Sequence, residues 1–164
     1  MPSKAARLGN VHCVPADLTG VHEAVLEAVR FPRALPVAPC PPPVLQEERP
    51  DLVVSANTLS QLPLIPLEKL WLTGRYGDNE LESFARGVIE GHLAWLASFD
   101  APRCLITDVA WLAMGRGETL SADPLHGVVP PPPGDRWEWR VAPRPEAHPE
   151  RDVVHVVAAS LTGI

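Results

Sequence analysis

The segment PDLVVSANTLSQLP, at Pro50–Pro63, decides the fold prediction. Its first part, Asp51–Ser55, is a short apolar run after a proline-rich stretch and carries two β-branched valines, which is typical of a buried strand. Ala56–Gln61 is then expected to form the loop at the carboxyl end of this strand. A second run of the same kind, Arg103–Val109 (RCLITDV), is polar only near its end. Together the two runs predict adjacent parallel strands in one sheet.

Apolar residues at helical spacing separate and precede these strands. Val21–Val29 has such a pattern, and Asp17 or Thr19 is its expected cap. Pro66 is expected to open a short helix, and Asp78 or Asn79 to cap a longer one. The apolar stripe of the longer helix consists of Leu81, Phe84, Ala85, Val88, Ile89, His92, Leu93 and Leu96.

Three further segments read as strands. Leu8–Ala16 is expected to be the first strand, while Trp137–Val141 and Arg151–Ser160 are expected to form an antiparallel pair at the end. Strands that alternate with helices predict an α/β fold with a sheet that is parallel in its first part. Residues 1–164 are expected to form a single domain. It contains a proline-rich loop at 32–50 and a proline- and glycine-rich loop at 115–135.

Composition excludes several classes of protein. The 164 residues carry a net charge of −6, which disfavours a nucleic-acid partner because such a partner selects a basic surface. The three cysteines are odd in number and have no CxxC spacing, so a disulfide framework is not expected. With neither a secretory h-region nor an apolar run long enough to span a membrane, a cytoplasmic protein is expected.

The common catalytic fingerprints are absent. The sequence has no GxxxxGK[ST], no HExxH and no calcium loop, and its six histidines lack metal-ligand spacing, so no metal site is predicted. Ser60, Asp108 and His155 follow the chain order of the α/β hydrolases. However, Ser60 lies in TLSQL and not in GxSxG, so no nucleophile elbow is predicted. No residue is assigned as catalytic.

Ligands of such sheets bind outside the carboxyl ends of the strands. This rule selects Asp17–Gly20, Ser55–Gln61 and Thr107–Trp111 as one surface. Asp17 is as well suited to capping the next helix as to binding a ligand. Asn57 and Asp108 also have plain structural interpretations, as a turn residue and as a cap or surface ion-pair residue.

Four features carry a resemblance to a known family: ADLT at Ala16–Thr19, PDLVVSANTLSQLP at Pro50–Pro63, CLITDVAWL at Cys104–Leu112 and the closing strand pair. Together they resemble class I S-adenosylmethionine-dependent methyltransferases. The resemblance implies a Rossmann-like three-layer sandwich, with a mostly parallel sheet and an antiparallel C-terminal strand pair. It covers most of the chain but only the later part of the family's fold. The family's glycine-rich loop after strand 1 and acidic residue after strand 2 do not occur upstream of Asp17, so an N-terminally truncated domain is expected.

The resemblance also implies roles for individual residues. The cofactor S-adenosylmethionine would contact residues after the third and fourth family strands, namely Asp17, Leu18, Ser55, Ala56 and Asn57. The methyl acceptor, a small molecule or a protein, would contact Gln61, Asp108 and Trp111. The alternative interpretation of Trp111 is that it packs in the hydrophobic core and contacts no ligand. Because the glycine-rich loop is missing, weak or absent binding of the cofactor is expected.

A second interpretation belongs to a different class of function. The missing strands would leave the strand at Asp51–Ser55 with an unpaired edge, which is a template for another chain. Two proline runs, Pro41–Pro43 and Pro130–Pro133, are further candidate segments for binding another protein. This alternative is a non-catalytic binding or scaffold domain, with a homodimer formed through the exposed strand edge.

Overall fold

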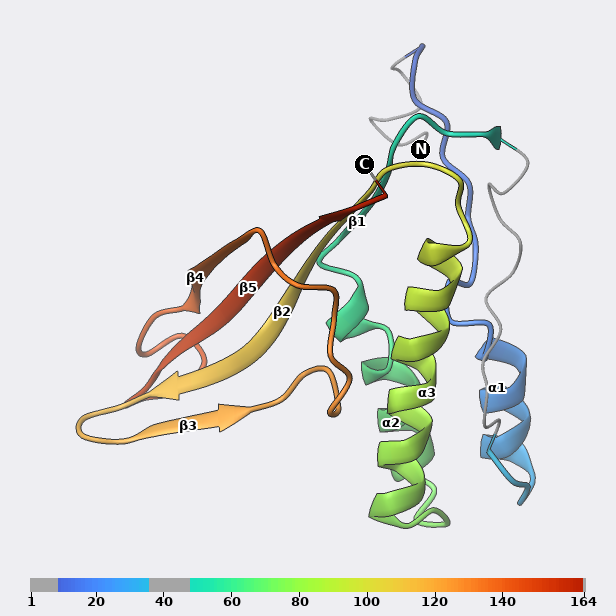
Figure 1. The fold of residues 1–164 in the computed structure, drawn as a ribbon. Helices are drawn as coiled ribbons and strands as arrows, with labels where there is room; N and C mark the ends of the chain where they lie inside the picture. The colour runs from blue at the N-terminus through green and yellow to red at the C-terminus, as the bar shows by residue number, and fades with distance from the viewer. Residues whose placement is uncertain (1–8, 36–47, 164) are drawn as a thin grey trace.

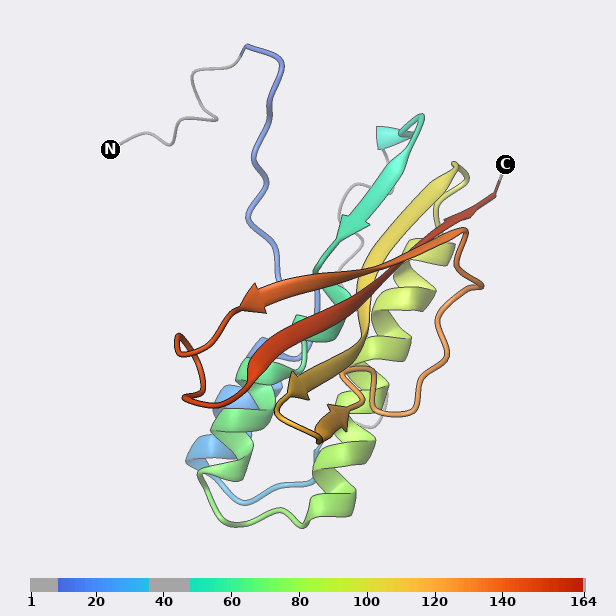
Figure 2. The same cartoon turned by 90° about the vertical axis from the view of Figure 1, so that its left-hand side faces the viewer.

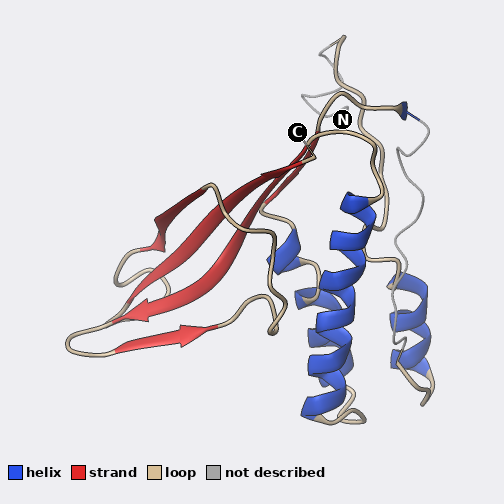
Figure 3. Ribbon diagram, viewed as in Figure 1, coloured by secondary structure: helices blue, strands red, loops and turns tan. Residues whose placement is uncertain are grey.

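A computed structural model describes residues 9–35 and 48–163 of the chain (Figure 1). In the described part, helices occupy one side and a curled sheet the other (Figure 3). The elements in chain order are α1 (His22–Arg30), β1 (Val53–Ala56), the 3-10 helix η3 (Leu59–Gln61), α2 (Leu64–Trp71), α3 (Asp78–Ala97), β2 (Arg103–Met114), β3 (Thr119–Ala122), β4 (Asp135–Ala142) and β5 (Asp152–Thr162).

The sheet has the strand order β1-β2-β5-β4, and the short β3 pairs with the far end of β2. Only β1 and β2 are parallel, with Val53 opposite Arg103 and Ala56 opposite Ile106. This confirms the predicted parallel pairing of the two apolar runs. β5 lies antiparallel between β2 and β4, as expected for the closing strands. The connection from β1 to β2 through α2 and α3 is the one parallel crossover in the described sheet.

The predicted Rossmann-like three-layer sandwich with a mostly parallel sheet is wrong. One strand pair is parallel and the other three are antiparallel, so this is a mixed sheet. The helices α1, α2 and α3 lie on one side of it, which leaves its other face open (Figures 1 and 2). β2 runs for 12 residues, well past the predicted Val109, and carries antiparallel partners on both sides. Because β2 is long and has these antiparallel partners, most of the strand pairing in the sheet is antiparallel.

Two smaller expectations are also corrected. Residues 11–16 form no strand but an exposed extended segment, because no neighbouring strand pairs with them among the described residues. The loop predicted at 115–135 contains β3. Most of the predicted loop at 32–50, including Pro41–Pro43, lies outside the described residues. In addition, the N-cap of α3 is Gly77 and not the predicted Asp78 or Asn79, which are the first two residues of the helix. The Gly77 N–H donates to the Glu80 carboxylate at 2.9 Å.

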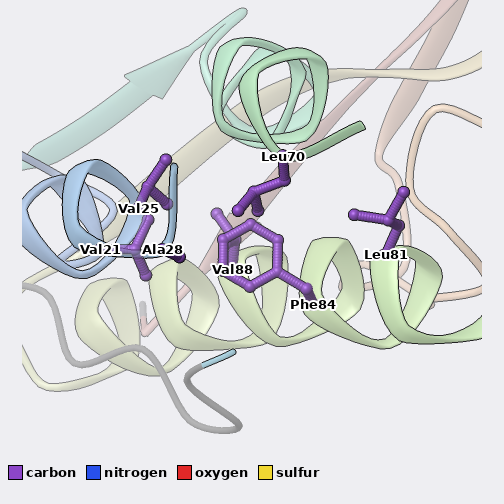
Figure 4. Packing of buried hydrophobic residues seen from close by; sticks show 7 residues of the cluster. All are labelled: Val21, Val25, Ala28, Leu70, Leu81, Phe84 and Val88. Carbon is purple, nitrogen blue, oxygen red and sulfur yellow. The ribbon is translucent and has the colours of Figure 1, made fainter. Parts of the chain in front are cut away.

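α3 separates two hydrophobic clusters. One cluster joins α3 to α1 and α2 (Figure 4) and consists of Val21, Val25, Ala28, Leu70, Leu81, Phe84 and Val88. The other joins α3 to the sheet and to the loop after β3, and consists of Leu59, Ile89, Trp95, Leu96, Phe99, Leu105 and Leu125. The predicted stripe of the long helix therefore packs on two sides. In the described part of the chain, no helix is both long and apolar enough to cross a membrane.

The open face of the sheet carries exposed large side chains. The strand registers place Val54 and Leu161 on this face at one end, and Trp137 and Trp139 at the other. Their exposed fractions are 54%, 55%, 42% and 51%. Residues of the opposite face, such as Leu105 and Val109, pack against the helical side. The exposed side chains therefore lie at the two ends of this face, whereas Asp108 and Val157 between them are buried.

Candidate functional site

A pocket of about 360 Å³ lies at the carboxyl end of β1, bounded by α1, α2 and the loop with η3. Its polar lining consists of Asp17, Thr19, His22, Asn57, Thr58, Gln61 and Lys69. Its apolar wall consists of Val25, Leu26, Leu62, Ile65 and Pro66. The pocket therefore brings together three of the predicted site residues, from segments far apart in sequence. Apolar walls with a few polar groups are the usual composition of a small-molecule site.

Asp17 caps the first turn of α1. Its Oδ1 accepts hydrogen bonds from the Thr19 N–H at 2.9 Å and from the Thr19 hydroxyl, and its Oδ2 accepts one from the His22 N–H at 3.0 Å. Burial acts to raise the pKa of Asp17, but these hydrogen bonds and one from the Gly20 N–H outweigh it and hold the pKa below its ordinary value. The N-cap position of α1 is Val21, which makes no side-chain cap bond, but Asp17 accepts a hydrogen bond from the first N–H of the helix as the capping interpretation expected. The contact of Asp17 with a cofactor stays a prediction.

Replacing Asp17 with alanine is expected to lower the free energy of unfolding by about 1 kcal/mol at neutral pH, because the first turn of α1 loses its side-chain acceptor. A carboxylate whose pKa is lowered by folding stabilises the native state above its unfolded pKa and loses this effect as the pH falls. The difference between wild type and variant should therefore shrink in acid. Urea unfolding at several pH values measures it, with the exposed Asp51→Ala as control; a constant difference would contradict the capping role.

Asn57 stands where β1 ends and the chain turns into η3. Its φ of 52° is in the left-handed region, which asparagine tolerates better than most residues. Its N–H donates to the Ile106 carbonyl at 2.8 Å, which holds the turn against β2. Its Oδ1 is buried and has no hydrogen-bond partner among the described residues. Asn57 is thus both a turn residue, as one interpretation predicted, and a lining residue of the pocket with an unused acceptor.

The other predicted cofactor residues lie outside this pocket. Leu18 lines a separate groove of about 380 Å³ between residues 14–18 and β1. Ala56 is exposed, and its carbonyl accepts a hydrogen bond from the Thr58 hydroxyl. Ser55 is 6% exposed and points to the helical side, where its hydroxyl lies 3.0 Å from Nε2 of His92. The structure therefore divides the predicted cofactor contacts between a pocket and the core beside it.

His92 is the most perturbed titratable group with a resolved value. It is 1% exposed on α3, and burial lowers its pKa to about 4. The backbone of Leu18 lies near enough to favour the protonated ring to a smaller extent, although Nδ1 makes no hydrogen bond of good geometry within the described residues. His92 is therefore neutral near pH 7 and positions Ser55 under the loop that carries Asn57.

Asp108 and Trp111 form a second cluster, where β2 continues beyond the end of β1. Asp108 is 3% exposed, and its Oδ2 faces the Ser60 hydroxyl at 3.1 Å, Nε1 of Trp111 at 3.0 Å and Nδ1 of His155 at 3.1 Å. The rings of Trp111 and His155 stack at a centroid distance of 5.5 Å. Gln61 follows Ser60 in η3 and lines the pocket, so η3 connects the two clusters.

Ser60, Asp108 and His155 meet in space but do not form a hydrolase triad. In a triad the imidazole lies between the serine and the carboxylate, so that it can take the hydroxyl proton. Here the carboxylate lies in the middle, and the Ser60 hydroxyl donates to it directly. Ser60 is also fully buried. The arrangement satisfies a buried carboxylate and offers no exposed nucleophile.

Sequence reasoning missed His92 as a partner of Ser55, although a polar residue in the apolar stripe of α3 was an available signal. Chain order had grouped His155 with Ser60 and Asp108, and these three residues do meet in space. The contact of His155 with Trp111 depends on the β2–β5 register, which the pattern of one strand cannot reveal. Lys69 and His22 complete the rim of the pocket and carry no sequence signal for this role.

The lining of the pocket suggests what kind of ligand could bind there. Its apolar wall and the amides of Asn57 and Gln61 suit a planar base that carries hydrogen-bonding groups. Asp17 is the one carboxylate of the lining, and both of its oxygens already accept hydrogen bonds. No glycine-rich turn follows a strand near the pocket in residues 9–35 and 48–163. The lining therefore has groups for a planar base and few for the remainder of a larger ligand.

Comparisons with protein-family models, with curated proteins and with solved structures found no match for this chain. The function must therefore be argued from the site and the topology alone.

Proposed function

We propose that this chain is related to the S-adenosylmethionine-dependent methyltransferases and binds the adenosine part of S-adenosylmethionine in the pocket beside the carboxyl end of β1. Methyl transfer from a sulfonium needs little acid–base chemistry, because the donor is already activated and the protein has mainly to position the two reactants. Asp17, Asn57 and Gln61 would hold and orient the base and its neighbouring groups.

The strand arrangement is the observation that carries this proposal. A parallel pair, β1 and β2, is followed by an antiparallel strand β5 inserted between β2 and the last neighbour β4. From the sequence, DLVVS and CLITD are expected on adjacent parallel strands, and the resemblance implied an antiparallel strand pair at the end of the sheet. The pocket also lies at the carboxyl end of β1, where ligands of parallel strands bind.

Binding of S-adenosylmethionine is expected to be weak, with a dissociation constant on the order of a millimolar, because each missing hydrogen bond to a polar ligand costs about 1–3 kcal/mol. NMR titration of the full chain with S-adenosylmethionine measures it through the side-chain amides of Asn57 and Gln61. Ile65→Trp should abolish the shifts, because the indole would fill the apolar end of the pocket. Leu64→Trp is the matched control, since Leu64 is exposed and does not line the pocket.

Two results would contradict the proposal in different ways. If saturating ligand moves no resonance of the pocket, the chain does not bind this cofactor. Micromolar binding that Asp17→Ala abolishes would instead mean that the site is more complete than its lining indicates. Titration with adenosine alone separates the base from the rest of the ligand: equal affinity for adenosine and for S-adenosylmethionine is expected from this pocket.

The methyl acceptor is proposed to be a small molecule or a protein side chain, because the net charge of −6 disfavours nucleic acid. Asp108 and Trp111 remain the proposed residues on the acceptor side. Asp108 is 3% exposed, accepts hydrogen bonds from Ser60 and Trp111 and lies 3.1 Å from Nδ1 of His155, so it would act through its neighbours and not as a free base.

A second candidate function, a non-catalytic binding module, is supported by the outer edge of β1. In the described part of the chain, β1 pairs with β2 alone, and Leu52 and Val54 beside that edge are exposed. An added strand would satisfy the free backbone groups. The proline run at Pro130–Pro133 supports this function less, because the Pro131 carbonyl accepts a hydrogen bond from the Ser160 hydroxyl and part of the run packs beside α3.

A further inference from the structure

The outer edge of β4 is the longest unpaired strand edge in the described structure. β4 has 8 residues and pairs with β5 alone, and all of them except Ala142 are exposed. Its sequence, DRWEWRVA, contains neither proline nor lysine, the residues that commonly protect an edge from pairing. The edge does carry charged side chains and a bulge near Ala142, so a second strand pairs with it only if that strand neutralises these charges and avoids the bulge.

The two faces of β4 differ in chemistry. Asp135, Trp137 and Trp139 lie on the open face of the sheet, because they stand opposite Ala159, Val157 and His155. Arg136, Glu138 and Arg140 alternate with them on the other face. β4 lies on the side of the sheet away from the helices (Figure 1). The charged side chains of this second face are exposed as well.

Two of these charges have no ionic partner within the described residues. Neither Arg136 nor Glu138 forms an ion pair there, and two positions apart along a strand they do not face each other. Arg140 differs, because it lies near Asp152. The pKa of Asp152 is lowered chiefly by the N–H of Arg144 and also by the charges of Arg144 and Arg140. Arg136 and Glu138 are therefore the charges that an incoming strand could still neutralise.

We propose that β4 pairs with β4 of a second copy of this chain, antiparallel and about a two-fold axis at Trp137. An isologous interface of this kind places residues symmetrically about the axis. Trp137 then faces its own copy, and Arg136 of each chain faces Glu138 of the other, which makes two ion pairs. Asp135 faces Trp139, whose indole N–H is a donor for the carboxylate. The sheet becomes continuous across the two copies.

The alternative axis at Trp139 satisfies fewer groups. It would place Glu138 opposite Arg140, which already has Asp152 beside it, and leave Arg136 opposite Ala142. It would also run through the bulge between Arg140 and Ala142, where the regular register of β4 is interrupted. The axis at Trp137 uses residues 134–140 only, which precede the bulge. Charge and backbone regularity thus select the same register.

Sedimentation equilibrium of the full chain over a concentration series tests the pairing. Wild type is expected to dimerise reversibly. The acidic variant Arg136→Glu and the basic variant Glu138→Arg each turn both ion pairs into repulsive pairs, so each should weaken dimerisation by roughly tenfold or more. An equimolar mixture of the two variants should restore a dimer, because every cross-chain pair is then attractive in the heterodimer.

Arg140→Glu is the matched control. Arg140 faces Gly134 of the second copy in this register, so the variant should change the dimerisation constant by no more than roughly twofold. A monomeric wild type, or single variants that dimerise as wild type does, would overturn the proposal. Restoration of the Glu138→Arg dimer by Arg140→Glu, and not by Arg136→Glu, would place the axis at Trp139 and overturn the register.

Cysteine cross-linking gives a second test that does not depend on the charge variants. In a chain whose three native cysteines are replaced by serine, Trp137→Cys should form a covalent dimer on oxidation, because residues directly opposite each other lie within disulfide range. Trp139→Cys should not, since its nearest copy lies several residues along the strand. Equal cross-linking of the two variants, or none with Trp137→Cys, would contradict the register. Circular dichroism establishes that each variant is folded.

Discussion

Replacing Asp108 with alanine is expected to lower the free energy of unfolding by about 2–4 kcal/mol, because the hydrogen-bond donors packed around this buried carboxylate lose their acceptor. The substitution leaves the Ser60 hydroxyl, Nε1 of Trp111 and Nδ1 of His155 without their common acceptor. Ser60 is fully buried and no water reaches its hydroxyl, so its unmet hydrogen bond alone costs about 1–3 kcal/mol. Equilibrium unfolding in urea measures the change.

Two further variants serve as controls for this measurement of stability. Asp108→Asn keeps one acceptor oxygen in the network and should lose less stability than the alanine variant. Asp100→Ala removes an exposed carboxylate near the end of α3 and should change the free energy of unfolding by less than about 0.5 kcal/mol. If the Asp108→Ala protein were as stable as wild type, the cluster would not support the fold, and its geometry would have to be explained by binding alone.

The stability of the protein is expected to fall by about 3 kcal/mol as the pH is lowered from 6.5 to 4, through His92 alone. In the unfolded chain this histidine binds a proton near pH 6.5, whereas in the native state burial lowers its pKa to about 4. Between these values the unfolded state binds more protons, so acid favours unfolding. Below about pH 4 both states are protonated, and the contribution of His92 becomes constant.

The difference between wild type and His92→Gln isolates this effect. Glutamine keeps a polar group beside Ser55 but does not titrate, so the variant should lack the His92 part of the pH dependence. His12→Gln is the control, because His12 is exposed and its replacement should leave the slope unchanged. Identical slopes for wild type and His92→Gln between pH 4 and 6.5 would mean that His92 is protonated in the native state.

Local pattern predicted most elements of this fold but not their arrangement. The valines of β1, the stripe of α3 and the alternation of β4 follow from hydrophobic periodicity, which depends on near neighbours in sequence. The segment 11–16 has the composition of a strand yet forms none, because no partner strand lies beside it among the described residues. The reach of β2 to Met114 was also missed, since its partner β3 lies in a stretch that glycine and proline mark as a loop.

The candidate site was predicted as a surface and found as two clusters. Asp17, Asn57 and Gln61 do line one pocket, but the rule of the carboxyl ends applies only to Asn57 and Gln61, because residues 11–16 before Asp17 form no strand. The rule also grouped Asp108 and Trp111 with them, whereas these residues lie farther along β2 and bond to Ser60 and His155. Separating the clusters requires the β2–β5 register and the bulge between Asp108 and Ala110, which shifts the facing of every later residue. A single sequence does not encode that register in any local pattern.

The position of β2 at the centre of the sheet has a kinetic consequence. β2 pairs with β1 before it, with β3 directly after it and with β5, where Arg103 is opposite Thr162 near the end of the chain. The β2–β3 hairpin closes a short loop, but the β2–β5 ladder cannot form until β5 has been synthesised, about 40 residues after β2. Contacts of such high sequence separation slow folding. During synthesis, the edge of β2 that pairs with β5 therefore stays open to incorrect strand pairing until β5 is available.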